Sequence, residues 1–129
     1  MDTGDTAWIL ASSALVLLMT PGLAFFYGGM VRSKTVLNMM MMSFSALAIV
    51  PVLWVLYGYS LAFSPGGNQF LGGFKRLGLQ NISADTAYGT IPEYVFVGFQ
   101  LMFAIITLAL ISGAIADRAK FSAWIVFSV

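Results

Sequence analysis

Three phenylalanines in an apolar segment have the spacing needed to form an attractive surface for a cation. Phe96, Phe99 and Phe103 recur every three or four residues, which in a helix places them on one face. An aromatic face attracts a partly desolvated small cation with about 0.5–2 kcal/mol. Carrying a charge to the centre of a bilayer costs several kcal/mol at least. The rings could therefore gather a cation at an entrance, whereas transit needs other groups or an ion that can lose its charge.

The same phenylalanines also fit a plainer interpretation, in which they face lipid or pack a helical bundle. Gln100 is the one polar side chain between Phe96 and Phe103. Residue types and spacing alone leave both interpretations open.

Composition identifies the chain as a membrane protein. Of its 129 residues, 60% are hydrophobic and 9% are charged, against roughly a quarter charged in soluble domains. The net charge of +1 gives no basic patch for nucleic acid. The chain has no cysteine and no histidine, so disulfides, thiolate metal sites and histidine proton shuttles are excluded. We expect no cofactor and no enzymatic activity, because no base and nucleophile can be paired within the apolar segments.

The elements that must position these rings are predicted from the charge-free intervals. A membrane-spanning helix needs about 20 apolar residues to cross about 30 Å of hydrocarbon. Three intervals meet this requirement, and we predict helices at about residues 6–31, 35–63 and 92–116. Residues 121–129 begin a fourth apolar run. The predicted fold is all-α, and residues 1–129 form part of a single membrane domain.

The basic residues predict the orientation of the chain. Cytoplasmic loops are enriched in lysine and arginine. One side of the membrane would carry four such residues, namely Arg32, Lys34, Arg118 and Lys120. The other side would carry two, Lys75 and Arg76. The first group is therefore predicted to be cytoplasmic, with the amino terminus outside.

Irregular features fall in the outer loop and within the first two helices. Residues 64–91 form a polar connection, in which Phe70, Leu71, Phe74 and Leu77 are expected to pack back on the bundle. Residues 81–83 read Asn-Ile-Ser, which is either a glycosylation acceptor or a chance tripeptide. Pro21 and Pro51 predict kinks. Such a kink either shapes a pathway or is ordinary irregularity, and ordinary irregularity is the commoner case in membrane helices.

A series of motifs resembles the ammonium transporter (Amt/Mep/Rh) family, and its Amt branch in particular. The motifs run through nearly the whole chain in the family's order: MTPGLAFFYGG at 19–29 followed by RSK at 32–34, WVLYGYSLAF at 54–63, FQLMFA at 99–104, SGAIADR at 112–118 and FS at 121–122. A single Pro-Gly or Phe-Gln would not be specific, whereas the ordered series is.

The resemblance implies a fold, an activity and partners. The fold would be a homotrimer of eleven-helix subunits, each built from inverted repeats with its own pore. The activity would be recruitment of ammonium, or of its analogue methylammonium, at an outer aromatic site, followed by deprotonation and passage through a hydrophobic pore. The protein would be a multi-pass protein of the cell membrane. A PII-type signalling protein would be a possible cytoplasmic partner.

The resemblance also assigns individual residues. Phe103 matches a ring of the outer ammonium site that is also half of a phenylalanine gate, and Phe99 matches an aromatic residue of the outer vestibule. Phe26 and Tyr27 match residues near the inner mouth. Gln100 is carried over as structural. Asp117 stands where the family commonly has glutamate, and we expect little effect because the charge is retained.

Other parts of the family's pathway would lie beyond Val129. The family's paired pore histidines, a tryptophan and a serine of its recruitment site, and a supporting aspartate all belong to later helices. The 129 residues alone are therefore not expected to transport. Two other classes remain open, namely a segment of a different channel or transporter and a structural helical bundle that transports nothing.

Overall fold

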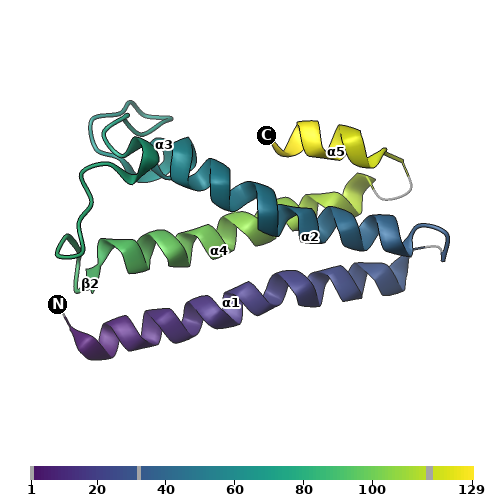
Figure 1. The fold of residues 1–129 in the computed structure, drawn as a ribbon, viewed down its shortest axis with the longest axis horizontal. Coiled ribbons are helices and arrows are strands. Elements are labelled where there is room, and N and C mark those ends of the chain that lie inside the picture. Colours follow the sequence, from purple (N-terminus) through teal and green to yellow (C-terminus); the bar gives the residue numbers. More distant parts are fainter. Residues whose placement is uncertain (1, 32, 116–117) are drawn as a thin grey trace.

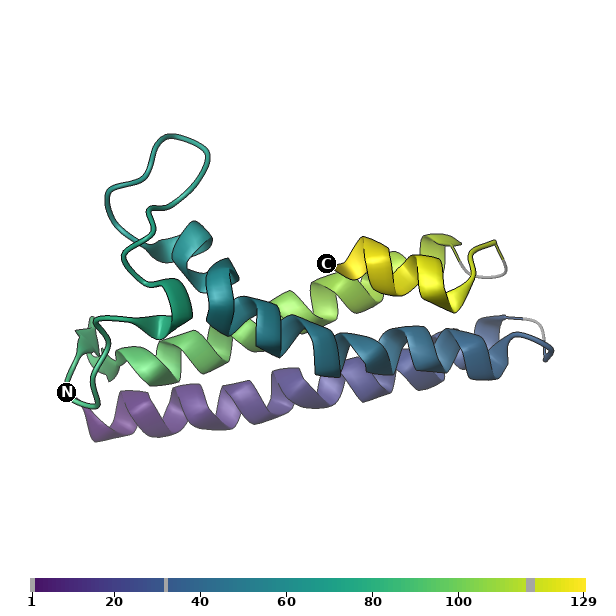
Figure 2. The same ribbon diagram turned by 45° about the horizontal axis from the view of Figure 1, so that its top comes forward.

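Three long helices lie side by side in the computed structural model, and a short helix near the carboxyl end packs against the second of them (Figures 1 and 2). The structure describes residues 2–31, 33–115 and 118–129. Helix α1 is Thr3–Met30, α2 is Val36–Leu53, α4 is Glu93–Ile111 and α5 is Phe121–Ser128. Two further helical segments, Trp54–Gly58 and α3 (Tyr59–Phe63), continue α2 without a break, and a 3₁₀ turn, Ser112–Ile115, continues α4.

The long helices confirm the predicted fold class. Thr3–Met30, Val36–Phe63 and Glu93–Ile115 are all long and apolar enough to cross a membrane, with mean hydropathies of 2.0, 2.1 and 2.3. Many large apolar side chains point outward from them, as expected where lipid or further helices replace water. The turn at residues 33–35 and the start of α5 lie towards one end of the bundle, and the amino-terminal end of α1 lies at the other (Figure 1). Arg32 and Asp117, which the sequence analysis used, lie outside the described residues.

The two prolines have different consequences. Pro21 lies inside α1, which runs unbroken from Thr3 to Met30. Pro51 lies in the last turn of α2, and a π-helical segment, Trp54–Gly58, follows it. There the Tyr59 N–H donates to the Trp54 carbonyl, five residues back. Because proline has no N–H, the helix loses a bond at Pro51, and such widened turns are one way in which membrane helices adapt.

The centre of the bundle is built from small residues that allow close helix contact. Ala46 of α2 and Ala109 of α4 are fully buried and pack with Ile105. One turn closer to the end that carries the predicted cytoplasmic residues, the buried hydroxyls of Ser43 and Ser112 lie 3.4 Å apart. Without a hydrophobic drive between helices in lipid, such close packing and interhelical polar contacts are what hold helices together.

Helix α5 is held on the bundle by one large side chain. The Trp124 ring is fully buried, and its indole N–H lies 3.0 Å from the Met42 carbonyl and 2.9 Å from the Ser45 hydroxyl. The short apolar run at the end of the chain therefore forms a helix, in the way the sequence predicted for the start of a fourth helix.

The loop of residues 64–91 packs back on the bundle, but not through three of the four side chains that the sequence suggested. Phe70, Leu71 and Phe74 are 90%, 54% and 70% exposed, so that expectation was wrong for them, and Leu77 is half-buried. The side chain of Ile82 packs against Tyr59 and Val97 instead. The loop also approaches the end of α3 through its backbone. Gly72 donates to the Leu61 carbonyl at 2.5 Å, and the Ser60 hydroxyl donates to the Gly73 carbonyl at 2.6 Å.

Glycine is required for this approach, because a Cβ added at residue 72 would lie 2.5 Å from the Ser60 carbonyl oxygen. A bulky phenylalanine cannot come so close to a helix end. The phenylalanines of the loop are therefore left on its outer surface.

A small hairpin connects the loop to α4. Strands β1 (Ala87–Tyr88) and β2 (Ile91–Pro92) pair antiparallel, with Tyr88 opposite Ile91. Gly89 has φ of +63° in the two-residue turn, a position that favours glycine. Thr90 then ties the hairpin to the start of α1, because its hydroxyl donates to the Asp5 carboxylate at 2.6 Å and its carbonyl accepts from Asp2 at 2.8 Å.

Candidate functional site

Two of the predicted site residues form an aromatic pair on α4. The rings of Phe99 and Phe103 meet edge to face, with centroids 5.2 Å apart and an interplanar angle of 86°. Phe103 is 41% exposed and Phe99 is half-buried. In this geometry the edge of one ring is directed at the face of the other, and the exposure of Phe103 leaves part of the pair accessible. The pair therefore presents π surface to whatever lies beside α4.

Phe96 does not join this pair, although it lies one helical turn before Phe99. Its ring stacks on Tyr88 of the hairpin, with centroids 3.9 Å apart and an angle of 12°. It also meets Phe63 edge to face at 5.1 Å and Tyr59 at 6.4 Å. The hairpin and α3 thus pack against Phe96, and the predicted row of three rings is divided into Phe96, which contacts those rings, and the separate Phe99–Phe103 pair.

A polar cluster that sequence reasoning missed lies beneath these aromatic rings. The Glu93 carboxylate is 5% exposed, accepts a 2.9 Å hydrogen bond from the Tyr59 hydroxyl, and lies 3.5 Å from a guanidinium nitrogen of Arg76. Arg76 also donates to the Asn81 carbonyl. Sequence alone identifies Arg76 only as one of two basic residues in the connection between the second and third predicted helices. The signal available was a single acidic residue directly before an apolar helix, which does not specify its partners.

The other two predicted residues lie towards the opposite end of the bundle. The Tyr27 hydroxyl donates to the Leu110 carbonyl at 2.9 Å and so joins α1 to α4. Gly113 leaves room for this ring, since a Cβ there would lie 2.7 Å from it. Phe26 is 62% exposed, with its ring 6.2 Å from that of Tyr27. Leu110 lies seven residues beyond Phe103, or about 10 Å along the helix, so the site residues form two separate groups.

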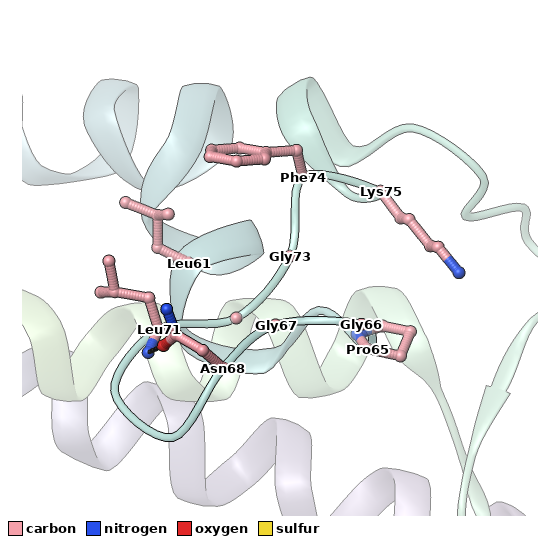
Figure 3. A pocket seen from close by; sticks show the side chains of 10 residues that line it. Leu61, Pro65, Gly66, Gly67, Asn68, Leu71, Gly73, Phe74 and Lys75 are labelled. Carbon is pink, nitrogen blue, oxygen red and sulfur yellow. Dashed lines mark hydrogen bonds between the residues drawn. The ribbon is translucent and has the colours of Figure 1, made fainter.

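A hollow in the outer loop is a poor candidate for binding a cation (Figure 3). It has a volume of about 410 Å³ and lies between the end of α3 and residues 65–75. Its lining is mostly glycine and apolar side chains, with the polar Asn68 and the basic Lys75, and it includes no acidic residue. Asn68 is already used within the loop, where its side-chain oxygen accepts from the N–H groups of Phe70 and Leu71. The hollow shares no residue with the Phe99–Phe103 pair.

The amino-terminal half of α4 is therefore the strongest candidate site. It combines an open aromatic pair with a helix start that is fixed by buried polar contacts. Aromatic faces in a partly desolvated setting favour small cations over neutral solutes.

Comparison with known proteins gives one consistent result. A sequence model described as the Ammonium Transporter Family matches residues 7–129. An ammonium transporter of Mycobacterium tuberculosis is 60% identical over 144 residues, which cover 98% of this chain and 30% of that protein. An ammonium transporter of Bacillus subtilis is 51% identical over 131 residues, covering 100% of this chain and 32% of the relative.

Solved structures agree with the sequence comparison. Mep2 of Candida albicans superposes with a TM-score of 0.88 at 33% identity, over 99% of this chain and 28% of the Mep2 chain. Mep2 of Saccharomyces cerevisiae gives a TM-score of 0.87 at 35% identity, over 99% of this chain and 29% of the other. The chain thus spans about 30% of the length of the relatives that it matches.

Proposed function

Because the chain belongs to the Ammonium Transporter Family, we propose that it supplies the amino-terminal helices of a protein that moves ammonium or ammonia across the cell membrane. The observation that carries this proposal is the open Phe99–Phe103 pair, with its rings edge to face at 5.2 Å. The pair lies in the amino-terminal half of a membrane-length helix, the half that is proposed to face outward. Ammonium is a small cation that such ring faces attract.

We propose that the Phe99–Phe103 pair recruits ammonium. Phe103 is also proposed to form part of the gate that follows the recruitment site. Cation–π attraction of about 0.5–2 kcal/mol can concentrate ammonium at an entrance. It is too small to offset the cost of moving a charge into hydrocarbon. Ammonium would therefore lose its proton before it passes Phe103, and neutral ammonia would continue. Phe26 and Tyr27 are proposed to lie near the inner mouth of the path.

The path is proposed to be completed by helices that these residues do not include. No histidine occurs in the chain, so side chains that would escort ammonia and exchange its proton have to come from elsewhere in the protein. We therefore propose that the 129 residues are the amino-terminal part of a single membrane domain and do not transport by themselves. A transporter of this kind has no need of a cofactor or a covalent reaction with its substrate.

The assembly and orientation are part of the same proposal. The amino terminus and the outer loop would face outward, and Lys34, Arg118 and Lys120 would face the cytoplasm, as the distribution of basic residues favours. The complete subunits would form a homotrimer. The cytoplasmic face would then be available to a PII-type regulatory protein.

The uptake of different cations tests the proposed function. In membrane vesicles that contain the full-length protein, labelled methylammonium should be taken up, and ammonium should compete with it. Potassium itself should enter at least tenfold more slowly than methylammonium, because potassium resembles ammonium in charge but cannot lose a proton. Vesicles from the same host without the protein provide the background. Uptake of potassium at the rate of methylammonium would indicate a general cation channel and would contradict the proposal, as would the absence of specific methylammonium uptake.

A further inference from the structure

We propose that Tyr59, Glu93 and Arg76 form a positioning network that sets how well the Phe99–Phe103 pair binds ammonium. This inference rests on the proposed function. None of the three residues is taken to touch the ion. They act by fixing the first turn of α4, from which the aromatic pair projects.

The network joins three separate parts of the chain at one buried carboxylate. Glu93 opens α4, Tyr59 opens α3, and Arg76 belongs to the outer loop. The Tyr59 ring and the Glu93 side chain are almost fully buried, and the Arg76 side chain is 21% exposed. A buried carboxylate is costly unless it is paired and hydrogen-bonded. Here the Tyr59 hydroxyl and the Arg76 guanidinium meet both needs.

Further contacts hold the same turn of α4 on its other sides. The Tyr94 hydroxyl donates to the Ile82 carbonyl at 2.9 Å, and the Trp54 indole N–H lies 3.3 Å from the Val97 carbonyl. Phe96 is stacked on Tyr88. Four of the first five residues of α4 are therefore tied to α3, the loop, the hairpin or the π-helical segment.

Phe99 follows directly after this fixed stretch, two residues beyond Val97. A helix is stiff over so short a distance, about 9 Å from Glu93 to Phe99. Rotation or fraying of the first turn would therefore change the direction of Phe99 and, one turn later, of Phe103. Cation–π attraction depends on an ion lying over a ring face, so a change in ring direction weakens binding.

Removing one member of the network should raise the KM for methylammonium in the full-length protein. We expect Glu93→Gln and Arg76→Gln each to raise KM by about 3- to 10-fold, which is within the range of cation–π attraction. The maximal rate per correctly folded protein should change less than twofold. Arg76→Lys, which keeps one charge, should recover part of the affinity. Tyr59→Phe, which removes only the hydroxyl, should behave like Glu93→Gln.

A neighbouring lysine separates positioning from simple attraction by charge. Lys75 is exposed, and its side chain has no partner in the network. If Glu93 attracted ammonium at long range, Arg76→Gln and Lys75→Gln would both lower KM, and the effect would fade with added salt. Positioning predicts instead that Lys75→Gln leaves KM unchanged and that the rise in the Arg76→Gln variant persists at high salt.

The outcomes distinguish this inference from the function on which it rests. If the unaltered full-length protein takes up no methylammonium, the proposed function fails. If it transports normally and the network variants only lower the amount of folded protein, with unchanged KM, the network is merely structural and this inference is wrong. A lower KM in Arg76→Gln would also overturn it.

Discussion

Replacing Trp124 by alanine is expected to cause a large loss of stability. The side chain is fully buried between α5 and α2, and its N–H group is shared between the Met42 carbonyl and the Ser45 hydroxyl. Truncating buried tryptophan in soluble proteins costs about 3–5 kcal/mol. We expect the lower end of that range, because lipid is as apolar as the side chains that the ring contacts. Stability can be measured by circular dichroism during denaturation of the full-length protein in detergent.

Two further substitutions help to interpret the loss of stability in Trp124→Ala: one separates the hydrogen bond from the packing of the ring, and the other is a control. Trp124→Phe keeps an aromatic ring but removes the donor, and should cost about 1–2 kcal/mol. Trp8→Ala is the control, since Trp8 is 71% exposed near the start of α1. If Trp124→Ala were no more harmful than Trp8→Ala, the docking of α5 against α2 would be wrong.

The second large effect concerns transport and Phe103. Phe103→Leu keeps an apolar side chain of similar reach but removes the π face. We expect the KM for methylammonium to rise about 2- to 30-fold, which corresponds to about 0.5–2 kcal/mol of cation–π attraction. Phe99→Leu should act in the same direction. The measurement is initial uptake over a range of methylammonium concentrations in vesicles with the full-length protein.

An exposed phenylalanine provides the matched control for this effect. Phe70 lies in the outer loop and is 90% exposed, so Phe70→Leu should leave KM unchanged. A KM in Phe103→Leu equal to that of the unaltered protein would show that ring faces do not recruit the ion. The assignment of the outer site to α4 would then be lost.

The long helices could be predicted from sequence because their cause is local. Long intervals free of charge and rich in apolar residues can only be accommodated by membrane spans. The structure places Thr3–Met30, Val36–Phe63 and Glu93–Ile115 close to the predicted ranges. The start of a fourth helix at residue 121 followed from the same reasoning.

The packing of the loop at residues 64–91 could not be predicted, because it depends on contacts between distant residues. Apolar side chains at positions 70, 71 and 74 suggested burial, yet the contacts are made by the backbone of Gly72 and Gly73 and by the side chain of Ile82. The burial of Glu93 has the same origin. A carboxylate beside a loop is expected to be solvated, and only the fold brings the Tyr59 hydroxyl and the Arg76 guanidinium to it.

The candidate site was predicted in part. Helical spacing correctly placed Phe99 beside Phe103, because that pairing depends only on the helix repeat. Helical spacing also predicted that Phe96 would join them. The structure differs there, because the Phe96 ring stacks on Tyr88 of the hairpin. The roles of Phe99, Phe103, Phe26 and Tyr27 in transport remain predictions that rest on resemblance and on the chemistry of aromatic rings.

The central claim is that the aromatic pair can attract ammonium but cannot carry it across a membrane without further helices. The most direct test places the 129-residue polypeptide alone and the full-length protein in separate liposomes of the same lipid and measures entry of labelled methylammonium. We predict saturable uptake that ammonium inhibits with the full-length protein, and only the leak of empty liposomes with the 129 residues. Selective, saturable uptake by the 129 residues alone would contradict the claim.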